Sequence, residues 1–263
     1  MGRNLKITLA YDGSEFHGWQ VQPGLRTVQG TLAECLKRIT GEDVLPQGSG
    51  CTDAGVHALG QVASVFVESP IPESNFVIAL NDVLPPSIRV SSVRAVRDGF
   101  HARHSAKAKT YRYRIYRGDI CPPFLARYVY HEPYPMNEEA LMRSSESVVG
   151  IHDFTAFAAS DPDRNARLAA AAEEENASRV GRLSNVRTIH SSQWMRTEEE
   201  LIYTVRGDGF LHHMVRNLVG TFLLVGKGSL KISDVPTILE ARDRSAAGPT
   251  AAACGLYLVS VEY

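Results

Sequence analysis

The feature that most constrains the fold is a repeated succession of strand-type and helix-type apolar patterns. Alternating apolar residues predict a strand over residues 6–11, which the turn pair Asp12-Gly13 ends. Thr27 is a helix-capping residue type, and the apolar residues that follow it recur at helical spacing: Val28, Leu32, Cys35, Leu36 and Ile39. Further strands are predicted over residues 44–47, 61–67 and 88–96, and a short helix over residues 76–84. If the strand at about 44–47 forms, the order is strand, helix, strand, strand, helix, strand.

The second half shows a similar succession. A strand is predicted over residues 110–116, with Tyr111 and Tyr113 on one face and Arg112 and Arg114 on the other. Asn137 is expected to cap a helix that runs to Val149 and closes at Gly150. The remaining predicted elements are strands over 189–195, 201–206 and 256–261, and a helix over 210–225 with one continuous apolar stripe.

These patterns indicate an α+β fold. We expect two related ferredoxin-like halves whose antiparallel sheets join around a central active-site cleft. The first half would cover residues 1–104 and carry Asp53, and the second would cover residues 105–263. An Ala/Glu-rich stretch at about 161–184 has almost no large apolar side chain, and it is expected to be an exposed helical or mobile insertion.

Composition excludes several classes of protein. The four cysteines form no CxxC pair, which argues against a zinc site or a disulfide framework and favours reduced thiols in a cytosolic protein. The first residues lack the apolar stretch of a signal peptide, and no apolar run approaches the roughly 20 residues that span a bilayer. We therefore expect a cytoplasmic location.

The charge distribution points to a nucleic-acid partner more than the net charge does. The formal net charge is only -1, yet the stretch from His101 to Arg117 has six basic residues and no acidic one. They are Arg103, Lys107, Lys109, Arg112, Arg114 and Arg117. Such a stripe can neutralise several phosphates, although a solvated strand edge would have the same pattern.

Asp53 stands in a short polar segment between small residues, Gly50-Cys51-Thr52-Asp53-Ala54-Gly55. The glycines allow a flat ligand to approach the backbone and one carboxylate. On its own, an aspartate between glycines is more often a turn residue than a catalytic group. A metal site using Asp53 with His101 and His104, or with His212 and His213, is a weaker alternative because neither pair has helical i,i+4 spacing. No G-x-S-x-G elbow or Gly-rich phosphate loop is present.

Six segments, taken together, are more specific than any one of them. In chain order they start at Tyr11 (YDGSEFHGWQVQ), Gly50 (GCTDAGVH), Phe100 (FHARHSAK, continuing to Tyr111-Arg112-Tyr113), His152 (HDFTAF), Met214 (MVRNLVG) and Ala247 (AGPT, continuing to Gly255-Leu256-Tyr257-Leu258). This succession resembles the TruA family of tRNA pseudouridine synthases across essentially the whole chain.

The resemblance implies a function and a set of site residues. Asp53 is expected to be the catalytic aspartate, and Arg216 the basic residue that pairs with it and favours its ionised form. Tyr111 is expected to pack on the target base, with Leu256 as an apolar contact. The basic residues expected to bind RNA are Arg103, Lys107, Lys109, Arg112 and Arg114. The family acts without cofactor or metal, as a homodimer, on uridines at tRNA positions 38–40 in the anticodon arm.

The chain departs from the family pattern at Cys51, where the family has an arginine thought to contact the RNA at the flipped base. A thiol cannot replace a bidentate phosphate contact. The proline usual in the last motif is also absent, leaving Ala251-Ala252-Ala253. Three hypotheses follow: an active tRNA pseudouridine synthase, a weakly active protein that binds and folds tRNA, and an unrelated metal-dependent hydrolase.

Overall fold

The computed structural model describes residues 2–159 and 184–263. The Ala/Glu-rich insertion expected at 161–184 therefore lies outside the described residues, except for Ser184. The chain divides into two compact units, one formed by Met1–Glu132 with Ala253–Tyr263 and the other by Pro133–Ala252. The bounds of these units do not coincide with the expected boundary at 104/105, because the C-terminal strand pairs both with the strand over 57–67 and with the strand over 108–116.

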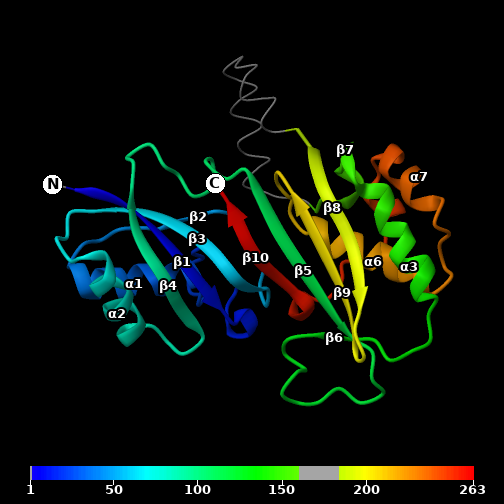
Figure 1. Ribbon diagram of the computed structural model, residues 1–263, viewed down its shortest axis with the longest axis horizontal. Coiled ribbons are helices and arrows are strands. Elements are labelled where there is room, and N and C mark those ends of the chain that lie inside the picture. The colour runs from blue at the N-terminus through cyan, green and yellow to red at the C-terminus, as the bar shows by residue number, and fades with distance from the viewer. Residues whose placement is uncertain (1, 160–183) are drawn as a thin grey trace. The chain divides into compact units, whose positions relative to one another are not determined.

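The sheet of the first unit has the strand order β4-β1-β3-β10-β5 (Figure 1). Its strands are β1 (Arg3–Tyr11), β2 (Gln47–Gly48), β3 (His57–Val67), β4 (Ile88–Val96), β5 (Ala108–Tyr116), β6 (Tyr130–His131) and β10 (Leu256–Glu262). Most pairings are antiparallel, but β10 runs parallel to β3 and β6 runs parallel to β5. The short β2 pairs with β3. The fold is therefore α+β with a mixed, mostly antiparallel sheet.

Two helices, α1 (Val28–Thr40) and α2 (Glu73–Val83), lie side by side in this unit (Figure 1). The Thr27 hydroxyl accepts a hydrogen bond from the Gly30 amide, so Thr27 is the N-cap that its residue type predicts. The expected apolar stripe of α1 is buried except at Ile39, which is only partly so. This stripe of α1 contributes to the core of the unit, together with the fully buried Leu5, Ile7 and Leu9 of β1.

Among its described residues, the second unit has strands in the order β9-β8-β7. Its strands are β7 (Gly150–Asp153), β8 (Val186–Arg196) and β9 (Glu200–Gly207), and its helices are α3 (Glu138–Ser144), α6 (Met214–Gly226) and α7 (Asp234–Ala241). Both strand pairings are antiparallel. Short 3-10 helices cover Ser145–Val148, Thr155–Phe157 and Arg244–Ala246 here, and Gly13–Glu15 and Ala253–Gly255 in the first unit.

Sequence expectations about element bounds were wrong at the start of β3, which is His57 instead of Gln61, and at three other places. The strand expected over 44–47 is reduced to Gln47–Gly48. The helix capped by Asn137 ends at Ser144, and Gly150 begins β7 instead of closing a helix. The helix expected from Phe210 starts at Met214, because His213 adopts a left-handed conformation (φ 59°) that ordinary helical backbone does not permit. No helix within residues 2–159 and 184–263 combines the length and apolar character needed to cross a membrane.

Candidate catalytic site

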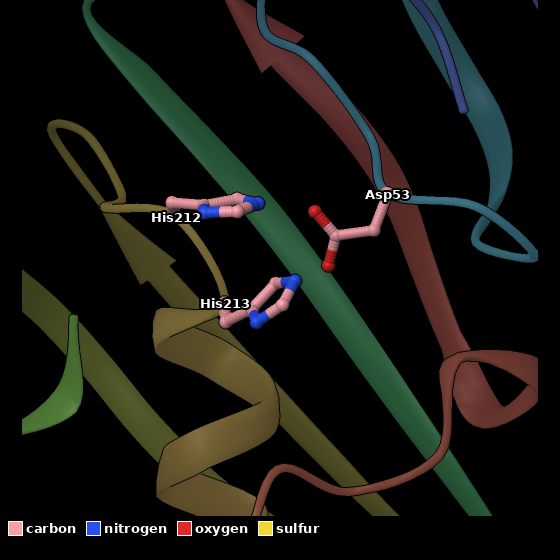
Figure 2. Close-up of side chains that lie close together, drawn as sticks. All are labelled: Asp53, His212 and His213. Carbon is pink, nitrogen blue, oxygen red and sulfur yellow. The ribbon is translucent and has the colours of Figure 1, made fainter. Parts of the chain in front are cut away.

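Asp53 lies half-buried on the loop between β2 and β3, and Figure 2 shows its side chain leaving that loop. The backbone is held on both sides of it. The Trp19 amide donates to the Thr52 carbonyl at 3.0 Å, and the Val56 amide donates to the Asp53 carbonyl at 3.1 Å. Gly18 has a positive φ of 85°, and a Cβ there would lie 2.6 Å from the Thr52 oxygen. The first motif therefore packs directly against the Asp53 loop, which leaves no room for a side chain at Gly18.

Tyr111 lies on β5 and Leu256 on β10, two strands that are paired antiparallel. Leu256 is opposite Tyr113 and Leu258 is opposite Tyr111, so all four side chains share one face of the sheet. Tyr111 is 8% exposed and Leu256 6%. Burial raises the pKa of Tyr111, and the nearby acidic side chains of Tyr11, Asp53 and Cys51 raise it further. The structure thus brings Tyr111 into the electrostatic environment of Asp53, as a neutral phenol at physiological pH.

The predicted basic stripe is divided between two faces of the sheet. Arg103 is exposed, and its charge opposes the rise in the Tyr111 pKa, which places it near that ring. The Lys109 ammonium donates to the Ser49 carbonyl at 2.7 Å, four residues before Asp53. The Lys107 side chain is exposed. Its backbone amide donates to the Glu262 carbonyl at 2.8 Å, which places Lys107 beside the end of β10.

Arg112 and Arg114 alternate with Tyr111 and Tyr113 along β5, so they lie on the opposite face of the sheet. The Arg114 guanidinium lies over the Tyr257 ring, 5.9 Å from its centroid. The expected separation of the two faces of this strand is confirmed. The five predicted basic residues therefore do not form one surface, because Arg112 and Arg114 lie on the face opposite Tyr111.

Arg216 belongs to the second unit, where it is the third residue of α6. Its Nε donates to the Ala251 carbonyl at 2.7 Å, and the Ala251 amide donates to the Arg216 carbonyl at 3.1 Å. The segment after Gly248 therefore fixes the first turn of α6. Figure 2 shows His212 and His213 immediately before this helix, and their ring centroids are 4.0 Å apart.

The next residue, Asn217, joins three of the predicted motifs. It is completely buried. Its amide nitrogen donates to the Phe157 carbonyl at 2.7 Å, and its oxygen accepts from the Thr250 hydroxyl at 2.7 Å and from Arg244 at 3.0 Å. Reasoning from residue types missed Asn217, because a lone asparagine on a helix has no distinctive signal outside its motif.

His57 is a structural group rather than a base. Its Nδ1 accepts from the Gly13 amide at 3.1 Å and its Nε2 donates to the Arg127 carbonyl at 3.0 Å, which fits a neutral ring with its proton on Nε2. Burial lowers the pKa of His57, and the nearby Asp12 charge opposes that shift only in part. The Tyr257 ring stacks on it at 4.8 Å. Asp12, His57, Tyr128 and Tyr257 are among the residues that line a cavity of about 380 Å³. The Tyr128 hydroxyl donates to the Asp12 carboxylate at 2.8 Å, and the Tyr257 hydroxyl donates to the Tyr128 carbonyl at 2.6 Å.

Comparisons with known proteins agree with this arrangement of motifs. A sequence model of the family described as tRNA pseudouridine synthase matches residues 7–105 and 145–263. The protein named tRNA pseudouridine synthase A from Solibacter usitatus is 49% identical over 261 residues, 99% of this chain and 100% of the relative. Proteins of the same name from Caldicellulosiruptor saccharolyticus (41% identical, 99% and 100% covered) and Moorella thermoacetica (42% identical, 98% and 99% covered) match equally fully. Because these similarities span nearly the whole chain, it belongs to the TruA family of tRNA pseudouridine synthases.

Proposed function

We propose that this chain is an isomerase that converts uridine to pseudouridine in the anticodon arm of tRNA, at positions 38–40. The observation that carries the proposal is the full-length similarity to proteins named tRNA pseudouridine synthase A, with 49% identity to one of them. The electrostatic proximity of Asp53 to the buried Tyr111 supports it further, because it unites a carboxylate with an aromatic surface for a base. The tRNA positions come from the family resemblance alone.

The chemistry is an internal rearrangement that balances without a co-reactant. The N1–C1′ bond breaks, the uracil turns, and C1′ bonds to C5, while the C5 proton is lost and N1 gains one. We propose Asp53 as the catalytic carboxylate, acting as a nucleophile, as a base or as a partner for charge at the sugar. We propose that Arg216 pairs with it and keeps it ionised. The reaction needs no metal, redox cofactor or group donor.

The target nucleotide must leave the RNA stack to meet Asp53. We propose that the base then stacks on Tyr111 and contacts Leu256, which offsets part of the few kcal/mol that unstacking costs. The position of Tyr111 supports this role, because its buried ring lies in the electrostatic environment of Asp53. Arg103, Lys107 and Lys109 would neutralise phosphates near the flipped base. Arg112 and Arg114, on the other face, would contact a more distant part of the RNA or none.

The finer organisation of the protein is part of the same proposal. We propose two related ferredoxin-like halves, with a boundary at 104/105 and with their sheets joined around a central cleft. The assignment of the first half is supported by the pairings of β4 with β1, β1 with β3 and β3 with β2, and by the two helices between these strands in sequence. A homodimer and a cytoplasmic location are expected for a family member that modifies tRNA.

A second candidate function follows from Cys51. Its side chain is exposed and its thiol lies 3.3 Å from the Gln20 amide oxygen, so the position is open to RNA but carries no cation. The chain would then bind and fold tRNA with little turnover. Retention of Asp53, Tyr111 and Arg216 favours the enzyme, because binding alone does not require this trio.

The two functions separate in one assay. An unmodified tRNA transcript carrying tritium at C5 of uridine releases that tritium when C5 bonds to the sugar. The wild-type chain should release it without added metal, and replacing the uridines at positions 38–40 by cytidine should abolish release. Tight tRNA binding without release, restored by Cys51→Arg, would establish the folding protein instead. Release that stops on adding a metal chelator would point to a metal-dependent enzyme.

A further inference from the structure

The side chain of Gln61 lies in the middle of β3 and is completely buried. A buried amide must find partners for two N–H donors and for its oxygen, or it destabilises the fold. All of these requirements are met. Nε2 donates to the Gly50 carbonyl at 3.0 Å and to the Tyr11 hydroxyl at 3.4 Å, and Oε1 accepts from the Ser49 hydroxyl at 2.6 Å and the Val62 amide at 3.1 Å.

Two of these four partners, Ser49 and Gly50, belong to the segment that leads to Asp53. A third, Tyr11, is connected to that segment by a hydrogen bond to Thr52. The Tyr11 hydroxyl accepts from Gln61, so its own proton is available to the Thr52 hydroxyl, 2.7 Å away. Burial raises the pKa of Tyr11 to about 12, which keeps this phenol a neutral donor throughout the physiological range. Ser49, Gly50 and Thr52 are therefore held by one connected network, and the residue after Thr52 is Asp53.

Gln61 occupies this place because of a local irregularity in the sheet. It pairs with Leu9 of β1, but the next pairing joins Tyr11 to Ala58, so β3 contains one extra residue. A bulge of this kind re-aims the side chains next to it. A Cβ at Gly60 would lie 2.5 Å from the Val259 carbonyl, so β10 approaches the bulge too closely for any side chain.

We propose that Gln61 and Tyr11 are positioning residues that hold the Asp53 carboxylate in its reactive place through Ser49, Gly50 and Thr52. Neither side chain is expected to touch the substrate. The inference rests on the proposed function, because it assigns a task to the site of that reaction. Its physical basis is that a displacement of about 1 Å at a reacting group costs on the order of a hundredfold in rate.

The test compares Gln61→Met, which keeps the length of the side chain and removes its four hydrogen bonds, with Tyr11→Phe, which removes one hydroxyl. Asn81→Leu is the matched control. Like Gln61, Asn81 has a side-chain amide that bonds the backbone of a neighbouring element: it donates to the Val90 carbonyl at 2.8 Å and accepts from the Val90 amide at 2.9 Å. These bonds join α2 to β4 and do not reach the Asp53 loop. The rate constant is measured in a single turnover with enzyme in excess, and tRNA affinity is measured separately.

Gln61→Met should lower the single-turnover rate by about tenfold to a hundredfold, with little change in tRNA affinity. Tyr11→Phe should lower it less, and the double variant should fall short of the product of the two effects, because both act through one network. Asn81→Leu should leave the rate unchanged. An unchanged rate in both Gln61→Met and Tyr11→Phe, or an equal loss in Asn81→Leu, would overturn the proposal. If Gln61→Met does not fold, Tyr11→Phe decides the matter.

Amide hydrogen exchange tests positioning independently of turnover. Three backbone amides report on the Asp53 loop. The Ser49 amide donates to the Val62 carbonyl, the Trp19 amide to the Thr52 carbonyl and the Val56 amide to the Asp53 carbonyl. They should exchange faster in Gln61→Met and Tyr11→Phe and at the wild-type rate in Asn81→Leu. Unchanged exchange in all three would refute the positioning role. An inactive wild-type protein with faster exchange in the two variants would refute the proposed reaction and leave the positioning of the loop supported.

Discussion

Replacing Asn217 by alanine is the perturbation whose cost can be derived most directly from the structure. The side chain is completely buried in the second unit and bonds the Phe157 carbonyl, the Thr250 hydroxyl and Arg244. A buried group that loses its partner costs about 1–3 kcal/mol. Arg244 retains the Gly248 carbonyl at 3.0 Å, so its loss is smaller. We expect Asn217→Ala to lower the free energy of unfolding of the second unit by about 2–4 kcal/mol.

The assay must report on this unit alone, because a chain of two units need not unfold in one step. Each unit contains one tryptophan, Trp19 in the first and Trp194 in the second. Urea unfolding in a Trp19→Phe background, followed by fluorescence, therefore reports on the surroundings of Trp194. The matched variant Thr250→Val removes one of the bonds of Asn217 and the 3.3 Å bond that the Thr250 hydroxyl accepts from Arg244, and it should cost about 0.5–1.5 kcal/mol. An Asn217→Ala cost no greater than that of Thr250→Val would refute the reasoning.

Three further predictions concern the first unit. Gly18→Ala should lower stability by about 1–3 kcal/mol and lower turnover, since its φ is positive and a Cβ would lie 2.6 Å from the Thr52 oxygen; thermal unfolding and the tritium assay measure both, and an unchanged protein would contradict the packing. Cys51→Arg should tighten tRNA binding and steepen its salt dependence by about one unit of slope, which filter binding at several salt concentrations measures. The pKa of His57 is lowered by burial from 6.5, so the unfolded chain binds a proton first as the pH falls. Stability should therefore be lost below about pH 6.5, and His57→Gln should reduce that slope in urea titrations; an unaltered slope would show that the ring does not carry the effect.

The order of elements in the first half was predictable because each has a strong local signal. The strand over 88–96 has the predicted bounds, and the Thr27 cap and the buried stripe of α1 are present. Local patterns failed where tertiary contacts decide. Gln47–Gly48 forms only a two-residue strand, and His57 joins β3 four residues before the predicted start, where β10 pairs with it.

The site was predictable only in part, and for a similar reason. The motifs singled out Asp53, Tyr111 and Leu256, and their roles stay predictions. The same stretch of sequence could not show that Lys109 bonds the Ser49 carbonyl, or that Gln61 serves the Asp53 loop, because those contacts depend on which strands become neighbours. Alternation along β5 did predict that Arg112 and Arg114 leave the face of Tyr111, so the division of the basic stripe was already implied by the strand.

Replacement of Asp53 tests the central claim most directly. Wild-type protein, Asp53→Ala and Asp53→Asn are compared for tritium release and for pseudouridine in the product RNA, with tRNA affinity measured in parallel. If Asp53 carries the reaction, wild type forms pseudouridine, both variants form none above background, and all three bind tRNA with similar affinity. Pseudouridine formed by either variant at a rate near that of the wild type would contradict the assignment of Asp53 as the catalytic carboxylate.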